Sequence, residues 1–137
     1  MEVIVDSNVY IYRAVKNSSY HAEAWRLLEE FSAWVTPTLV LHEVVWALHE
    51  LLGRERTLEF ISRLLRHEKL RVAPVIEQDI RWAVARVEDE GISLARYNDK
   101  VILAAARRLK IPLLTFDKQL LAQASRCGIE VVNPYQR

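Results

Sequence analysis

Short apolar runs alternate along the chain with longer segments whose apolar positions recur at helical spacing. The short runs predict five strands, at residues 3–5, 33–35, 70–73, 111–115 and 129–132. The longer segments predict seven helices, at residues 9–15, 20–31, 37–52, 55–66, 77–90, 98–109 and 118–127. Strands separated by helices in this way form parallel sheets with helices on both faces. The expected fold class is therefore α/β, a three-layer α/β/α arrangement around a central parallel five-stranded sheet.

Proline and glycine support the ends of these segments. Pro37 suits the first position of the third helix, where the missing N–H would have no helical partner anyway, and Gly53 is a natural stop for the same helix. In the fifth helix, Ile80, Val84 and Val87 share one side of the helical wheel, so we expect them to face inward.

Length and composition favour one globular domain. At 137 residues the chain is too short for two ordinary domains, so we expect a single domain over residues 1–137. The 19 basic and 18 acidic residues leave a formal net charge of +1, which argues against a basic coat protein but not against a nucleic-acid enzyme. The three glycines are scattered singly, so no glycine-rich phosphate loop is present.

Cysteine usage and hydropathy bear on the compartment. Cys127 is the only cysteine, which excludes a disulfide framework and favours a reducing, cytoplasmic setting. The N-terminus carries Glu2 and Asp6 and does not resemble a signal peptide. The longest apolar run, residues 101–106, falls far below the ~20 residues of a membrane span. We expect a soluble protein with no membrane partner.

Two acidic residues lie where predicted strands end. Asp6 follows the first strand, and Asp117 follows the fourth within the run Leu-Thr-Phe-Asp. Ligands of open parallel sheets bind beyond the carboxyl ends of the strands, which places both carboxylates at the functional edge. The alternative is that each simply caps the helix that follows it.

Two further acidic residues lie on apolar faces of predicted helices. Glu43 has Val40 and Ala47 as neighbours one turn away, and Asp99 aligns with Ile102. An unpaired carboxylate on such a face is costly to bury, so it needs a cation, hydrogen-bond donors or a raised pKa. The alternatives are a salt bridge with a buried arginine for Glu43 and a favourable position in the helix dipole for Asp99.

Taken together, the four acids predict one acidic site. At a spacing of ~4 Å and an effective dielectric near 20, each like-charged pair would cost about 4 kcal/mol. A cluster of Asp6, Glu43, Asp99 and Asp117 therefore requires a bound cation or protons. Ligation by oxygen alone suits Mg²⁺ or Mn²⁺, and the corresponding chemistry is metal-assisted hydrolysis of a phosphodiester.

Four short motifs carry a family resemblance. They are VDSN at residues 5–8, LHEV at 41–44, NDKVILAAA at 98–106 and LTFD at 114–117. In this order and spacing they resemble the PIN domain over essentially the whole chain, and the length resembles the VapC-type toxins of prokaryotic toxin–antitoxin pairs. The resemblance implies a Mg²⁺- or Mn²⁺-dependent endoribonuclease that cuts RNA, forms a homodimer and is inhibited by a cognate antitoxin.

The same resemblance implies roles for individual residues. Asp6 and Asp99 would be the principal metal ligands, and Asp117 would complete the site directly or through water. Glu43 would ligate the metal or activate the attacking water. Three polar positions would orient the carboxylates or the bound water: Ser7, Asn8 and Thr115. Asn98 is a less typical neighbour for the third acid and would add a hydrogen bond or nothing.

Other readings of the sequence were weighed. His42 and His49 are not at the i, i+4 spacing of a helical zinc pair, and Ser7 lacks the glycine-flanked turn of a hydrolase nucleophile. A phosphoacceptor domain would need an acid after the second or third strand, where the sequence has none. Two alternatives stay open: a non-catalytic PIN-like regulatory or interaction module, and a PIN nuclease of RNA processing that is not a toxin.

Two groups of side chains have less specific expectations. We expect most of the large aromatic residues to lie in the core, with some available for a dimer face or an antitoxin groove: Tyr10, Tyr12, Trp25, Trp34, Trp46 and Trp82. We expect the following basic residues to be solvated individually, with those near the acidic edge able to bind RNA phosphates: Arg13, Lys16, Arg54, Arg56, Lys100, Arg107, Arg108 and Lys118.

Overall fold

The computed structural model describes residues 1–136. The strands are β1 (Glu2–Val5), β2 (Ala33–Pro37), β3 (Leu70–Ala73), β4 (Leu113–Leu114) and β5 (Val131–Val132). The α-helices are α1 (Ser7–Ala14), α2 (His21–Glu30), α3 (Thr38–Leu52), α4 (Arg54–Leu65), α5 (Glu77–Glu90), α6 (Tyr97–Leu109) and α7 (Lys118–Arg126). Two short 3₁₀ turns complete the described chain, η1 (Leu94–Arg96) and η2 (Pro134–Gln136).

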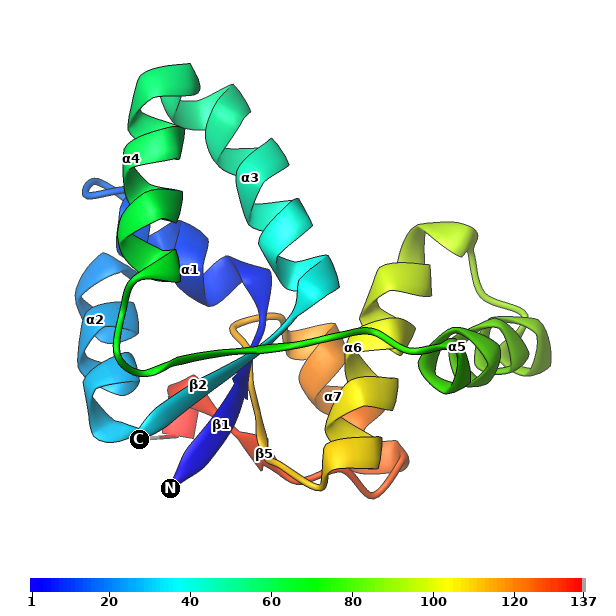
Figure 1. The fold of residues 1–137 in the computed structure, drawn as a ribbon. Helices are drawn as coiled ribbons and strands as arrows, with labels where there is room; N and C mark the ends of the chain where they lie inside the picture. The colour runs from blue at the N-terminus through cyan, green and yellow to red at the C-terminus, as the bar shows by residue number, and fades with distance from the viewer. Residues whose placement is uncertain (137) are drawn as a thin grey trace.

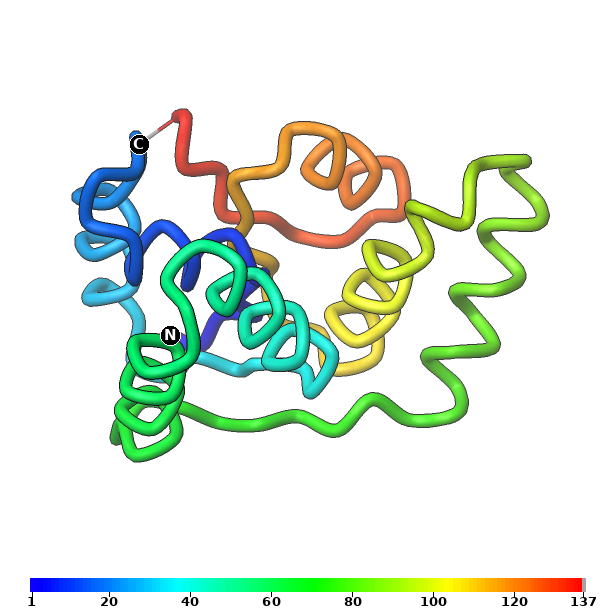
Figure 2. The backbone as a smooth tube through the Cα atoms, turned by 90° about the horizontal axis from the view of Figure 1, so that it is seen from above, coloured from blue at the N-terminus to red at the C-terminus, as the bar shows by residue number. Residues whose placement is uncertain are grey.

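The sheet is five-stranded and parallel throughout, with the strand order β3-β2-β1-β4-β5. Helices α1 to α4 lie on one side of it and α5 to α7 on the other (Figures 1 and 2). Strand β1 is central, and its residues Val3, Ile4 and Val5 are fully buried because both faces of the strand are covered. The predicted fold class is confirmed.

The order of the strands reverses at β1, between its neighbours β2 and β4. From β1 the chain proceeds to β2 and β3 on one side, whereas β4 and β5 lie on the other. The loops that leave β1 and β4 therefore diverge, and such a reversal point is where open α/β sheets bind ligands. The carboxyl ends of these two strands are tied together, since the N–H of Asp6 donates to the carbonyl of Leu114 at 3.1 Å.

Most predicted boundaries agree with the structure within one or two residues, but β4 and β5 are shorter than predicted. Pro37 was placed wrongly inside the third helix. It is the last residue of β2, in register with Ala73 of β3, and it caps the helix that begins at Thr38. Pro37 sits on the strand side of the junction with extended backbone, where a missing N–H is equally harmless.

The inward face of α5 was predicted correctly for Val87 and wrongly for Ile80 and Val84. Ile80 and Val84 are 43% and 51% exposed, and the buried residues of this helix are Asp79, Ala83 and Val87. Asp79 can lie inside because Arg108 of α6 donates two hydrogen bonds to its carboxylate, both at 2.9 Å. A hydropathy pattern assumes that the inward positions of a helix are apolar, whereas one inward position of α5 is an acid paired with an arginine.

Several aromatic and basic residues depart from expectation. Trp46 is 71% exposed and Trp25 is also exposed, while Trp34 lies in the core. Lys100, expected to be solvated, is only 1% exposed and holds both carboxylate oxygens of Glu90, at 2.9 and 3.0 Å. Arg13 is half-buried over the ring of Trp25. Within residues 1–136, no helix is both long enough and apolar enough to cross a membrane.

Candidate metal site at the carboxyl edge of the sheet

Asp6 lies at the end of β1 and caps α1. One carboxylate oxygen, Oδ1, accepts the N–H of Ser7 at 2.7 Å. The other, Oδ2, accepts the Thr115 hydroxyl at 2.7 Å and the Asn8 amide at 3.2 Å. The pKa of Asp6 is raised to about 7, chiefly by burial and to a smaller extent by the charges of Glu43 and Asp99, while the hydrogen bonds from Thr115 and Ser7 oppose the rise. Asp6 is therefore a buried acid whose partners are neutral.

Asn8 and Thr115 join the ends of β1 and β4. The Asn8 amide donates to Thr115 Oγ1 at 3.0 Å, and its carbonyl oxygen accepts the N–H of Phe116 at 3.0 Å. Thr115 Oγ1 also accepts the N–H of Asp117 at 3.0 Å. The two hydrogen bonds of Asn8 connect residues more than a hundred positions apart in sequence. Together with the bond from Asp117 to Thr115, they hold Asp6 and Asp117 on the same edge of the sheet.

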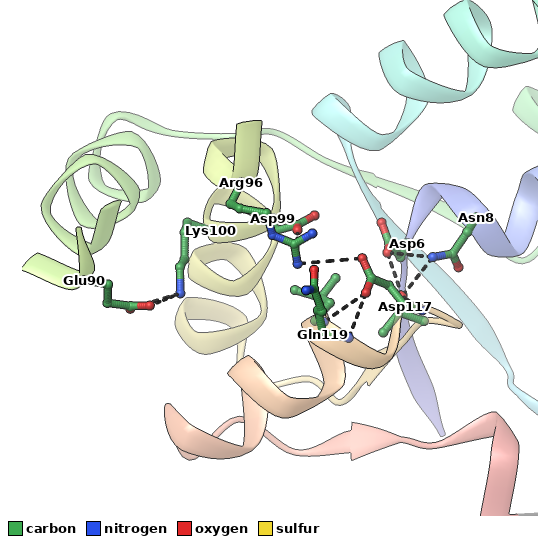
Figure 3. A network of polar contacts seen from close by, with 10 residues as sticks. Asp6, Asn8, Glu90, Arg96, Asp99, Lys100, Asp117 and Gln119 are labelled. Carbon is green, nitrogen blue, oxygen red and sulfur yellow. Dashed lines mark hydrogen bonds and ion pairs between the residues drawn. The ribbon is translucent and has the colours of Figure 1, made fainter. Parts of the chain in front are cut away.

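Asp117 has one oxygen in a structural role and the other facing the site. Its Oδ1 caps α7 by accepting the N–H groups of Gln119 and Leu120, at 2.9 and 3.2 Å. Its Oδ2 lies 3.9 Å from the guanidinium of Arg96. The capping alternative is thus correct for Oδ1. Oδ2 takes no part in capping and faces Arg96 (Figure 3).

Glu43 enters the site from α3. Its Oε2 accepts the side-chain amide of Asn98 at 3.2 Å, and the Ser7 side chain adds a hydrogen bond. Its Oε1 is buried with no hydrogen-bond partner. Burial raises the pKa of Glu43 in spite of these bonds, and the charge of Asp99 raises it further. The alternative of a salt bridge between Glu43 and a buried arginine is therefore not what the structure has. The hydrogen-bond partners of Glu43 are neutral, and Asn98 is one of them.

Asp99 lies in the first turn of α6 and is partly buried. Its pKa is raised, chiefly by burial and also by the charge of Asp117. The positive charges of Arg96 and Lys100 oppose this rise. Nη2 of Arg96 lies 2.8 Å from Asp99 Oδ2. Arg96 was not among the sequence-based candidates. Its position three residues before Asp99, the spacing of a helical ion pair, is the signal that could have revealed it.

The four acids influence one another but are not gathered around one point. Glu43 and Asp99 raise the pKa of Asp6, Asp99 raises that of Glu43, and Asp117 raises that of Asp99, so the four carboxylates share one edge of the sheet. Within the described part of the chain, however, no three acidic, histidine or cysteine side chains form a ready-made metal cluster. Arg96 reaches between Asp99 and Asp117 instead (Figure 3).

The residues present nevertheless fit a divalent cation. The unpartnered Oε1 of Glu43 needs a positive partner, and the raised pKa values of Asp6, Glu43 and Asp99 show that their charged forms are under-stabilised. A set of carboxylate oxygens is the ligand type that Mg²⁺ and Mn²⁺ prefer. A cation here would stabilise groups that the protein alone leaves poorly compensated.

Comparison with known proteins identifies the family and the fold of the chain. Residues 3–126 match the model of the PIN domain, so the chain belongs to the PIN domain family. Its structure is similar to VapC20 of Mycobacterium tuberculosis, a sarcin-ricin loop cleaving toxin, with a TM-score of 0.77 and 20% identity over 96% of this chain and 99% of that chain.

Two further similar structures are complexes. DNA-bound VapBC from Salmonella typhimurium has a TM-score of 0.72 and 18% identity over 98% of each chain. FitAcB from Neisseria gonorrhoeae has a TM-score of 0.73 and 17% identity over 98% of this chain and 99% of that one. No curated protein matches the sequence. The fold is therefore shared with VapC- and FitB-type toxins at low identity.

Proposed function

We propose that this chain is a Mg²⁺- or Mn²⁺-dependent endoribonuclease that hydrolyses RNA phosphodiester bonds. The observation that carries the proposal is the set of under-compensated carboxylates where β1 and β4 end, above all Glu43 with its buried, unpartnered oxygen. A module that only binds other proteins has no use for mutually repelling acids at this edge. Membership of the PIN family and the RNA-cleaving activity named for VapC20 support the same conclusion.

Within this proposal the acids have different roles. Asp6 and Asp99 are the principal metal ligands. Asp117 contributes Oδ2, the oxygen that does not cap α7, directly or through water. A divalent cation bound there supplies a water of lowered pKa and stabilises the charge that develops on the phosphate. Glu43 ligates the cation or accepts the proton of the attacking water, and its raised pKa suits the second role.

The surrounding polar residues orient these carboxylates. Thr115 and Asn8 hold Asp6 Oδ2, while Asn98 and Ser7 hold Glu43. Their hydrogen bonds fix which oxygen of each carboxylate faces the site, which is how surrounding residues tune metal ligands in general.

We further propose that the chain is the toxin of a type II toxin–antitoxin pair, acts in the cytoplasm as a homodimer and is inhibited by its antitoxin. Related structures were solved as toxin–antitoxin complexes, among them one from Klebsiella pneumoniae. Large apolar side chains of α3 and α4 are exposed in a way that is typical of a protein-binding surface: Val45, Trp46, Leu51, Leu58 and Leu65. On α5, Ile80 and Val84 are exposed as well, which is compatible with a second copy.

The nuclease proposal is tested with purified protein and structured RNAs, incubated with Mg²⁺, Mn²⁺ or EDTA. We expect cleavage only with metal, and a loss of at least about a hundredfold in Asp6→Asn and Asp99→Asn, because each removes a charged ligand. Glu77→Gln is the matched control, since Glu77 is an exposed acid of α5. Cleavage in EDTA, or undiminished cleavage by both variants, would refute the mechanism. No cleavage under any of these conditions would favour a non-catalytic module.

The toxin proposal needs a separate experiment. Controlled expression of the wild-type chain should arrest growth, and co-expression of the protein encoded by an adjacent small reading frame should relieve the arrest and copurify with the chain. A nuclease that is active in vitro, without growth arrest and without such a partner, would instead favour a role in RNA processing.

A further inference from the structure

Arg96 is the cation that links the two sides of the acidic site. It ends η1, directly before α6, and its guanidinium Nη2 lies 2.8 Å from Asp99 Oδ2 and 3.9 Å from Asp117 Oδ2. Asp99 belongs to α6, whereas Asp117 follows β4 and caps α7. In Figure 3 the side chain of Arg96 extends from the start of α6 toward Asp117. One positive charge therefore serves two acids that come from different elements.

The contact of Arg96 with Asp99 differs from a purely structural arginine–carboxylate pair. Arg108 binds Asp79 through two parallel hydrogen bonds, from Nε and Nη2, both at 2.9 Å. Nη2 of Arg96 is buried and close to Asp99, but no well-aligned hydrogen bond satisfies it. Bidentate geometry gives an arginine–carboxylate pair much of its strength. Arg96 is thus held by charge more than by directed bonds, and it is the more easily displaced of the two arginines.

A divalent cation would compete with Arg96 for the same atoms. Asp99 Oδ2 faces the guanidinium at 2.8 Å, and a metal bound to that oxygen would lie next to a second positive charge. Lys100 also lowers the pKa of Asp99, but its ammonium is committed to both oxygens of Glu90. Arg96 is therefore the positively charged side chain that must move away from Asp99 when a metal ion binds there.

We infer that Arg96 is an internal counter-ion of the acidic site: it bridges Asp99 and Asp117 in the metal-free protein and is displaced from Asp99 when a divalent cation binds. This inference rests on the proposed metal-dependent function and adds a positioning residue to it. Arg96 makes the metal-free site tolerable for its carboxylates, and it lowers the affinity of the site for metal. Metal entry also releases the side chain that connects the start of α6 to α7.

The experiment measures Mn²⁺ binding to the purified full chain by calorimetry at pH 7.5, with no RNA present. Wild type is compared with Arg96→Gln, Arg96→Lys and the control Arg81→Gln, which removes an equal charge from an exposed pair on α5. We expect Arg96→Gln to bind Mn²⁺ about three- to tenfold more tightly than wild type, because a competing charge is gone. Arg96→Lys should stay near wild type, and Arg81→Gln should change affinity less than twofold.

Thermal unfolding gives a second readout that does not depend on activity. Metal-free Arg96→Gln should melt below wild type, because Asp99 and Asp117 lose their shared cation, and saturating Mn²⁺ should raise its melting temperature more than that of wild type. Unchanged or weaker Mn²⁺ binding by a folded Arg96→Gln overturns the role of Arg96. If that variant does not fold without metal, refolding it in saturating Mn²⁺ decides the question: recovery of the folded state supports the role, and the absence of recovery overturns it.

The outcomes separate this inference from the proposed function. Wild-type protein that binds no Mn²⁺ and cleaves no RNA overturns the proposed function, and the role of Arg96 with it. Wild-type protein that binds Mn²⁺ and cleaves RNA, beside a folded Arg96→Gln with no gain in affinity, overturns only the role of Arg96.

Discussion

The acidic edge of the sheet and the contact between α5 and α6 treat buried charges in different ways. Between α5 and α6, two buried charges each have a partner of opposite charge: the buried Asp79 is bound by Arg108, and the almost fully buried Lys100 binds Glu90, whose side chain is 34% exposed. At the edge of the sheet, Asp6 has neutral partners and its pKa rises to about 7. Removing a charge from water is costly unless a partner of opposite charge replaces the water. Compensated acids support the fold, and acids left under-compensated indicate a site for a cation.

The largest expected effect comes from breaking a compensated pair. Glu90→Gln should lower the free energy of unfolding by about 3 kcal/mol, because the ammonium of Lys100, only 1% exposed, would keep its charge and lose its charged partner. Urea denaturation measures this, with Glu88→Gln, an exposed acid of the same helix, as the matched control. A loss below about 1 kcal/mol would show that the Lys100 ammonium reaches solvent, and that the two regions differ less than proposed.

At the acidic edge, pH should act in the direction set by raised pKa values. The pKa of Asp6 is higher in the folded protein than its ordinary value of 3.8, so its contribution to stability is present at low pH and is lost as pH rises through about 7. The metal-free protein should therefore melt on the order of 5 °C lower at pH 8.5 than at pH 5.5. Saturating Mn²⁺ should reduce this difference. A melting temperature that rises over this interval without metal would contradict the assignment.

A smaller effect, opposite in sign to that of Glu90→Gln, is expected for Glu43→Gln. Glu43 is an under-compensated acid, so its neutral isostere should raise the free energy of unfolding of the metal-free protein by about 1 kcal/mol at pH 8. The same variant should lose Mn²⁺ affinity. Glu50→Gln, an exposed acid of the same helix, is the matched control and should change neither quantity. Destabilisation by Glu43→Gln would mean that the carboxylate is better compensated than its contacts suggest.

The smallest effect is expected for an exposed ion pair. It shows whether the α5–α6 pairs stabilise the fold because they are buried, and not simply because they are paired. Glu77 and Arg81 of α5 form an ion pair at 2.6 Å, but both side chains are largely exposed. Glu77→Gln should change the free energy of unfolding by less than about 0.5 kcal/mol. Urea denaturation compares this loss with that of Glu90→Gln on the same helix, and losses of similar size would show that burial does not set the difference.

Sequence reasoning located the acids better than it located their partners. Asp6 and Asp117 follow apolar runs, and Glu43 interrupts an apolar helical face, so each one is visible in a local pattern. Lys100 is not visible in this way, and for Arg96 the local pattern shows only its spacing to Asp99, not its contact with Asp117. A helical wheel treats every basic residue as exposed, and whether a base turns inward depends on an acid that another element supplies. The same limitation made two residues of the predicted inward face of α5 wrong, because Asp79 is buried through Arg108 of α6 together with the N–H of Ile76.

The sequence by itself determined the class of fold and the chemical character of the site. Apolar runs separated by amphipathic segments can bury their surface only as βα repeats, and acids at strand ends must then lie on one edge of a parallel sheet. Only the tertiary structure decided that β4 lies beside β1, which brings the Thr115 hydroxyl within 2.7 Å of Asp6. No local pattern encodes that pairing, because strand order depends on how all the helices pack at once. The position of Arg96 between two acids from separate elements has the same origin.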